Sequence, residues 1–140
     1  MLLTVDSSVW IDYFNGRASA GADALDAVLS EGRYELVMLD VVLMEVLRGF
    51  RLTRELRRAE RVLAALPVAL AGGEGIARAA AYLYRALRQR GITVRSSIDL
   101  LVGAWCIEHE VSLLHADNDF DGMTAHGLQV FLPAPSFDRG

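Results

Sequence analysis

The chain has 140 residues, of which 53% are hydrophobic and 23% charged, so it can form one domain with a hydrophobic core and is too apolar to be intrinsically disordered. Its single cysteine, Cys106, excludes an internal disulfide and fits a buried position in a protein of the reducing cytoplasm. The net charge of −4 argues against a uniformly basic nucleic-acid binder, but the basic residues, all of them arginine, are unevenly distributed.

The ends of the apolar and amphipathic segments are marked by capping and breaking residues. In chain order the pattern predicts a strand at 2–5, helices at 9–14 and 22–29, a strand at 34–39, helices at 41–47, 52–66, 76–90 and 98–108, and strands at 111–114 and 127–131, before a tail with Pro133 and Pro135. Ser7 or Ser8 can cap the first helix, Asp40 can cap the third, which Gly49 ends, and Pro67 ends the fourth.

Strands that alternate with helices predict an α/β fold. We expect a three-layer α/β/α arrangement with a central, mainly parallel sheet, formed as a single domain over residues 1–140. The N-terminus has neither the basic nor the long apolar segment of a signal peptide. No stretch approaches the ~18 uninterrupted apolar residues of a membrane span. We therefore expect a cytoplasmic protein without a membrane partner.

Four acids lie at element ends or in apolar surroundings: Asp6, Glu45, Asp99 and Asp117. Ligands of parallel sheets bind beyond the C-terminal ends of the strands. Asp6 follows the first predicted strand directly, and Asp117 follows the strand at 111–114. Carboxylates without histidine or cysteine favour hard cations such as Mg²⁺ or Mn²⁺. Without these four, fourteen of the eighteen acids remain against fourteen arginines, so the excess negative charge can belong to the site itself.

Each of these acids also has a structural interpretation. Asp6 could cap a helix, although Ser7 or Ser8 could do so instead. Glu45 could form a buried ion pair with Arg48. Asp99 could belong to a capping box that Ser96 begins.

Other metal and phosphate sites fit the sequence poorly. The segment 117–122 matches the first half of an EF-hand loop, but Leu128 occupies the twelfth position, where a bidentate Glu is needed, so we expect an Asp-rich turn. The three histidines and Cys106 lack zinc-ligand spacing. The glycines at 72–75 follow no convincing strand and lack the lysine of a phosphate-binding loop.

Four segments, in this order, resemble the motifs of PIN-domain proteins and, more narrowly, of the VapC toxins of bacterial toxin–antitoxin pairs. They are Val5–Asp12, Glu45–Gly49, Ile98–Leu101 and Leu113–Phe120. The resemblance spans essentially the whole chain. It implies a metal-dependent endoribonuclease toxin of a type II toxin–antitoxin system that hydrolyses RNA phosphodiester bonds.

The resemblance also implies roles for individual residues and partners. Asp6, Glu45, Asp99 and Asp117 would be the catalytic acids, and Asp6, Asp99, Asp117 and Asp119 the candidate ligands of one or two Mg²⁺ or Mn²⁺ ions. Ser7 and Ser8 would contact the metal shell or the substrate. The family leads us to expect a homodimer that is blocked by a cognate VapB-like antitoxin.

RNA must approach an acidic site, so basic residues near it matter. Arg48 and the arginines that follow it to Arg61 could hold the RNA backbone, as could Arg85, Arg88, Arg90 and Arg95, although each could equally belong to a solvated helix face. Trp10, Tyr13 and Phe14 could stack on bases or lie in the core.

Two other functions compete with the nuclease. A catalytically idle PIN-fold binding module would not need the intact acids. A Mg²⁺-dependent phosphatase would need a second Asp two residues after Asp6, where this chain has Ser8.

Overall fold

The computed structural model describes residues 1–131, so the predicted tail with Pro133 and Pro135 lies outside the described residues. Helices and short strands alternate along the chain. In order they are β1 (Leu2–Val5), α1 (Ser7–Phe14), α2 (Ala20–Glu31), β2 (Glu35–Leu36), β3 (Met38–Leu39), α3 (Asp40–Arg48), α4 (Thr53–Leu63), β4 (Val68–Ala69), α5 (Glu74–Gln89), α6 (Ser97–His109), β5 (Ser112–Leu114) and the 3₁₀ helix η1 (Asn118–His126).

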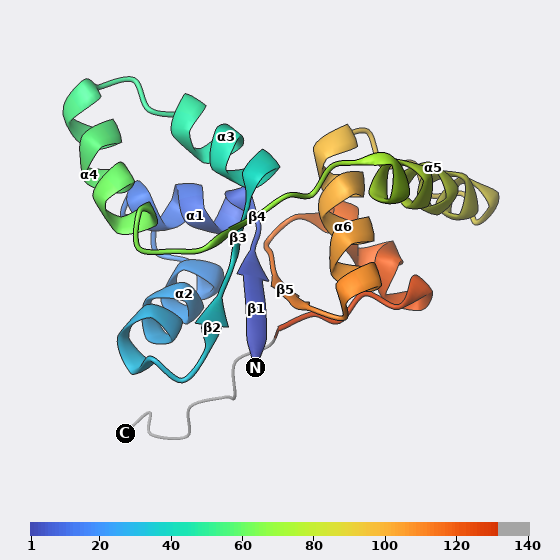
Figure 1. Ribbon diagram of the computed structural model, residues 1–140, viewed down its shortest axis with the longest axis horizontal. Coiled ribbons are helices and arrows are strands. Elements are labelled where there is room, and N and C mark those ends of the chain that lie inside the picture. The colour runs from blue at the N-terminus through green and yellow to red at the C-terminus, as the bar shows by residue number, and fades with distance from the viewer. Residues whose placement is uncertain (132–140) are drawn as a thin grey trace.

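The strand β1 is the centre of the fold. It pairs in parallel with β2 on one side and β5 on the other, while β3 and β4 form a second parallel pair. Figure 1 shows helices α1 to α4 on one side of β1 and α5 and α6 on the other. The predicted three-layer α/β/α fold with a mainly parallel sheet is thus confirmed. Leu3, Thr4 and Val5 are all buried, as expected for a strand covered on both faces.

The predicted strand at 34–39 is divided in the structure. The chain leaves β1 at Val37, whose N–H donates to the carbonyl of Leu3 (3.0 Å) and whose carbonyl accepts from the Thr4 hydroxyl (2.7 Å). The next residue, Met38, bonds instead to Pro67 (2.8 Å) and begins β3. Continuous apolar sequence hid this change of partner, because the residues on both sides of it, 36–39, are all buried.

Two further strand predictions need correction. The strand β4 was not predicted, since two residues after Pro67 carry no periodic pattern. The predicted last strand, 127–131, is reduced to one parallel bridge between Leu113 and Val130. The Asp-rich turn at 117–122 leads into η1, and no EF-hand helix precedes it, because β5 does.

Close packing between α6 and η1 holds the segment after β5 in place. A side chain at Gly103 in α6 would collide with the Met123 sulfur of η1, and one at Gly122 would lie 2.8 Å from Ile92. Cys106 is buried in the same helix, and burial raises the pKa of its thiol to about 12, as expected for a core residue. Among residues 1–131, no helix combines the length and apolarity required to cross a membrane.

Candidate metal centre

Asp6 stands where β1 ends and α1 begins, and its two carboxylate oxygens have different surroundings. Its backbone N–H continues the strand pairing by donating to the Leu114 carbonyl (2.9 Å). Its Oδ2 accepts hydrogen bonds from the Ser8 N–H (3.2 Å) and the Ser8 hydroxyl (2.7 Å), so Asp6 is the N-cap of α1. Its Oδ1 is buried without a hydrogen-bond partner. The prediction that Ser7 or Ser8 caps this helix was wrong, because the helix begins at Ser7, two residues before its predicted start, and the alternative of Asp6 as the cap is the one observed.

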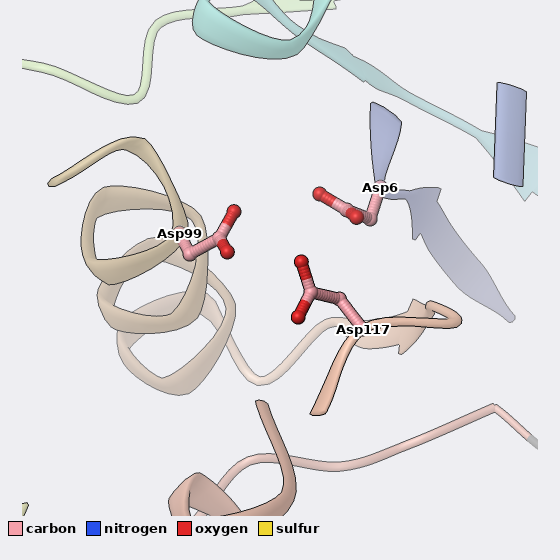
Figure 2. A group of neighbouring side chains, drawn as sticks. All are labelled: Asp6, Asp99 and Asp117. Atoms are coloured by element: carbon pink, nitrogen blue, oxygen red, sulfur yellow. The ribbon is translucent and has the colours of Figure 1, made fainter. Parts of the chain in front are cut away.

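Asp99 and Asp117 reach the same place from two other elements. Asp99 lies in the first turn of α6, where its N–H donates to the Ser96 hydroxyl (3.2 Å), which is half of the predicted capping box. Asp117 caps η1 and accepts from the Asp119 N–H (2.9 Å). One carboxylate oxygen each from Asp6, Asp99 and Asp117 lies within 4.8 Å of the others, and Figure 2 shows the three side chains facing a common centre.

The three carboxylates form an electrostatically unfavourable cluster when all are ionised. Burial raises the pKa of Asp6. Burial, followed by the negative charge of Asp6 and the proximity of Asp119 and Asp117, raises the pKa of Asp99 to about 8. None of the ion pairs within residues 1–131 includes Asp6, Asp99 or Asp117. Among the described residues, the cluster therefore has no cationic partner.

These residues fit a divalent metal ion. Oδ1 of Asp6 is buried without a hydrogen-bond partner, the Asp6 carboxylate lies next to two further carboxylates, and oxygen ligands suit Mg²⁺ and Mn²⁺. An ion among them would stabilise the ionised form of Asp99, which burial and then repulsion by Asp6 disfavour. The three aspartates could hold such an ion.

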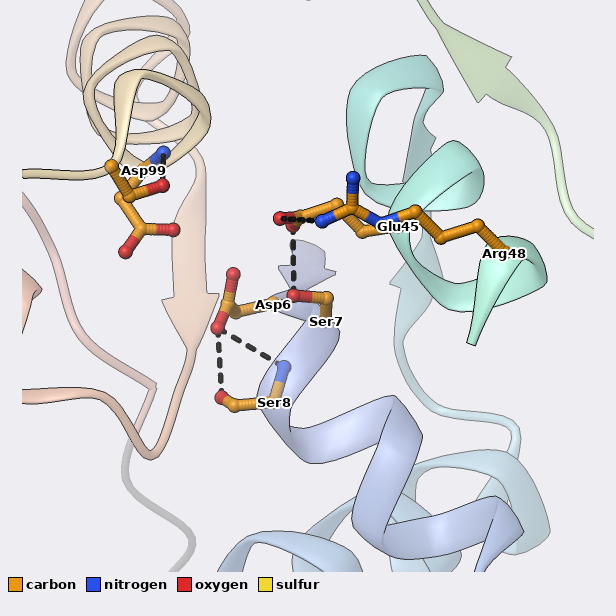
Figure 3. A network of polar contacts seen from close by, with 7 residues as sticks. Asp6, Ser7, Ser8, Glu45, Arg48 and Asp99 are labelled. Carbon is orange, nitrogen blue, oxygen red and sulfur yellow. Dashed lines mark hydrogen bonds and ion pairs between the residues drawn. The ribbon is translucent and has the colours of Figure 1, made fainter. Parts of the chain in front are cut away.

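Glu45 lies close to this cluster but outside it (Figure 3). Its Oε1 accepts from the Ser7 hydroxyl (2.9 Å), and its Oε2 is 3.8 Å from Nη2 of Arg48. The ion-pair interpretation is therefore present in the structure, although the Arg48 side chain is 65% exposed. Glu45 remains near enough to Asp6 for its charge to raise the pKa of that carboxyl.

Asp119 also lies outside the three-residue cluster. Its backbone holds the Asp117 carboxylate, and its side chain is near enough to Asp99 to raise that pKa. The sequence left open which of the two aspartates faces the metal, and this arrangement favours Asp117.

The two serines predicted to contact the metal shell or the substrate both hydrogen-bond to acids of the site. Ser7 binds Glu45, and Ser8 binds Asp6 while its hydroxyl accepts from the Ala116 N–H (3.4 Å). His115 was missed as part of the site: its Nδ1 accepts from the Asp117 N–H (3.3 Å) and its ring packs on Phe120. Its position two residues before Asp117 was the only signal in the sequence.

Of the aromatic residues considered for base stacking, Trp10 is buried and stacks on Phe14. Tyr13 packs edge-on against both, and Phe50 adds a fourth ring. These contacts match the alternative of a core position.

Comparison with known proteins identifies the family. The PIN domain matches residues 3–125. Ribonuclease VapC11 of Mycobacterium tuberculosis and VapC ribonuclease Mb1587 of Mycobacterium bovis are each 35% identical to this chain over 120 residues, which cover 86% of this chain and 90% of the relative.

Solved structures agree in fold. VapBC2 from Rickettsia felis, bound to a DNA fragment from its promoter, matches with a TM-score of 0.75 at 15% identity, covering 94% of this chain and 98% of the other. Mycobacterium tuberculosis VapC20, a sarcin–ricin loop cleaving toxin, matches with a TM-score of 0.65 at 17% identity, covering 94% and 99%. The chain therefore belongs to the PIN-domain family and, within it, to the VapC ribonucleases.

Proposed function

We propose that this chain is a metal-dependent endoribonuclease toxin whose reaction centre is formed by Asp6, Asp99 and Asp117. The observation that carries the proposal is the convergence of these three carboxylates, without a cationic partner in residues 1–131, at the C-terminal end of β1 and β5. One or two Mg²⁺ or Mn²⁺ ions would be held there. The homology to named VapC ribonucleases supports RNA as the substrate.

The residues around the centre suit phosphodiester hydrolysis. A bound Mg²⁺ or Mn²⁺ ion lowers the pKa of a water molecule and offsets the charge that develops on the phosphate. Asp6, Asp99 and Asp117 would hold this ion at the end of β1. Glu45, held by Ser7, is the carboxylate available to accept a proton from the attacking water. Arg48 lies beside Glu45 and is exposed, so it can turn to a substrate phosphate.

We further propose that the chain forms a single PIN domain over residues 1–140 and is a homodimer controlled by a VapB-like antitoxin. The structures with the same fold support the antitoxin, because several are VapBC or FitAB complexes. Such a partner would block access to the acidic centre.

Cleavage of total cellular RNA by the purified full chain, freed of antitoxin, tests the nuclease. We expect discrete fragments with Mg²⁺ or Mn²⁺ and none with EDTA. Asp6→Asn keeps a capping side chain but removes a charged ligand, so its cleavage rate should fall more than the ~10–100-fold that is typical of changes outside the ligand shell. Asp26→Asn, at an exposed position of α2, is the matched control and should cleave like the wild type.

Fragments that persist in EDTA, or that Asp6→Asn still produces at the wild-type rate, would contradict a metal centre at Asp6. A folded wild-type chain that cleaves nothing under any metal would favour the idle binding module.

A further inference from the structure

The segment from α5 to the start of α6 carries a large positive charge. Residues 74–97 contain five arginines and one glutamate, a net charge of +4 in a chain whose total is −4. Glu74 forms an ion pair with Arg78, with Nε of Arg78 2.9 Å from Oε2 of Glu74. Among residues 1–131, no ion pair involves the other four, which are Arg85, Arg88, Arg90 and Arg95, and all four are exposed. This surface therefore has positive charge available for an anionic partner.

A groove runs between α5 and the first turn of α6, with a volume of about 760 Å³. The residues that line it include the small and aliphatic Ala80, Ala81 and Leu101 as well as Tyr84, Arg85 and Arg95. Tyr84 is half-buried, so its ring is held against the protein while part of its surface faces the groove. An apolar lining with a tyrosine and two arginines combines a stacking surface with phosphate-binding charge.

The groove reaches the turn of α6 that carries Asp99. Ser97 and Leu100 line it, and Asp99 lies between them in the same turn of α6. A second hollow of about 410 Å³, lined by Tyr84, Arg85 and Arg88, extends it along α5. From Ala77 to Arg88 the helix advances roughly 16 Å at ~1.5 Å per residue. A basic track thus leads away from the carboxylates.

We propose that this α5–α6 groove binds the single-stranded RNA segment adjoining the scissile phosphate, an inference that rests on the proposed ribonuclease function. A base stacks on Tyr84, and Arg85, Arg88 and Arg95 bind the neighbouring phosphates. The acidic centre repels phosphate in the absence of metal, so this basic track supplies the attraction that brings the strand to it. Stacking accepts any base, so the groove contributes affinity more than sequence choice.

The other arginine-rich segment is a poorer candidate. Residues 51–61 contain five arginines but also Glu55 and Glu60. Figure 1 shows α4 and α5 at opposite ends of the long axis of the molecule. The hollow beside α4, about 320 Å³, is lined by Phe14, Phe50 and residues of α4, and includes no residue of α6. Arg54 and Arg58 of this hollow therefore provide a matched control for Arg85 and Arg95.

Fluorescence anisotropy with a labelled single-stranded RNA of random sequence tests the groove, in EDTA so that no cleavage intervenes. We expect Arg85→Gln/Arg95→Gln to weaken binding about tenfold or more and to flatten the slope of log K against log salt by about 1.4, as for two lost phosphate contacts. Arg54→Gln/Arg58→Gln should bind like the wild type. Tyr84→Leu should weaken binding about fivefold or more, whereas Tyr84→Phe, which keeps the ring, should not.

Thermal melting establishes that each variant is folded. The inference is overturned if the α4 variant carries the loss, if Tyr84→Leu binds like the wild type, or if the wild type binds no RNA. Light scattering tests whether a second copy of the chain binds in the groove instead. If Arg85→Gln/Arg95→Gln abolishes a dimer but leaves the RNA affinity unchanged, the groove is a contact between copies and the RNA site is refuted. RNA binding through the groove without metal-dependent cleavage would instead refute the proposed nuclease and leave the groove standing. Metal-dependent cleavage with an unchanged KM in the groove variants would refute the RNA site in the groove and leave the proposed nuclease standing.

Discussion

A cluster of three aspartates and a single glutamate lie side by side at the end of β1, and only the glutamate has a counter-ion among the described residues. Asp6, Asp99 and Asp117 are crowded together, and burial raises the pKa of Asp6 and Asp99. Glu45 accepts one hydrogen bond from the Ser7 hydroxyl and has Arg48 as a counter-ion. Two neighbouring residues thus have different roles: Asp6 belongs to the aspartate cluster, whereas Ser7 binds Glu45.

The difference indicates a division of labour. A crowded set of carboxylates is relieved either by protonation or by a bound cation, so its state depends on pH and metal. Glu45 already has a counter-ion within the chain, Arg48 at 3.8 Å. We therefore expect metal binding to depend on the aspartates, and the chemical step to depend on Glu45 without a comparable effect on metal affinity.

The largest expected effect comes from Asp99→Asn. At a pH above about 8, where Asp99 is ionised in the metal-free wild type, the neutral amide removes its charge repulsion, so the metal-free variant should melt at a higher temperature than the wild type. It should also lose the rise in Tm that Mg²⁺ gives the wild type, and with it RNA cleavage. Thermal scans in EDTA and in Mg²⁺ measure both effects, with the exposed Asp121→Asn of η1 as the control. A variant that keeps the wild-type Mg²⁺ response would show that Asp99 is not a ligand.

Glu45→Gln separates the two groups. If Glu45 accepts a proton in the reaction, cleavage should slow by about 10²–10⁴-fold, while the increase in Tm on adding Mg²⁺ stays near the wild-type value. Single-turnover cleavage and the same thermal scans provide the two readouts. Loss of the Mg²⁺ response in this variant would mean that Glu45 is itself a ligand and that the comparison fails.

The pH dependence of stability sharpens the contrast. The folded chain holds a proton on Asp99 up to a pKa of about 8, whereas the unfolded chain releases it near a pKa of ~4. Between these values the folded state binds more protons, so the free energy of unfolding of the metal-free protein should fall as the pH rises from 5 to 8. Denaturant titrations in EDTA measure this, and saturating Mg²⁺ or Asp99→Asn should flatten the slope. An equally steep fall in Asp99→Asn would assign the effect to another group.

The smallest effect is expected from Ser7→Ala, which releases Glu45 from its hydrogen bond. Stability should fall by about 1 kcal/mol or less, because the site is partly exposed to water. The cleavage rate should fall by about tenfold, since Glu45 loses its orientation but keeps its charge. Ser30→Ala, at an exposed position of α2, is the control. Unchanged cleavage in Ser7→Ala would show that Arg48 alone positions Glu45.

The location of the centre could be predicted from the sequence because it depends on simple topology. Asp6 ends an apolar run, and Asp117 follows another, so parallel pairing of β1 and β5 brings them to one edge. The choice between Asp117 and Asp119 could not be predicted from the sequence, because it depends on the turn into η1, in which Asp117 is the cap. The separation of Glu45 from the aspartates was equally hidden, since it depends on whether the Ser7 side chain turns toward α3.

The fold shows the same limit. The long helices were predicted from their apolar faces, whereas β4 was missed and the strand at 34–39 was not divided, because pairing partners decide both. The α5–α6 groove depends on how two helices pack, which no local pattern in either helix specifies.

The two oxygens of Asp6 limit which residues could ever replace it. One oxygen accepts hydrogen bonds from Ser8 and so caps α1, and the other is buried without a hydrogen-bond partner, where the proposed cation would bind. Glutamate carries the same charge but sets it one methylene further from the backbone, where it cannot reach the Ser8 amide and the centre together. Asparagine can cap but brings no charge, and serine can cap but is too short. In a library of all substitutions selected for toxicity, this position should therefore accept aspartate alone, whereas selection for a folded chain should also admit asparagine and serine.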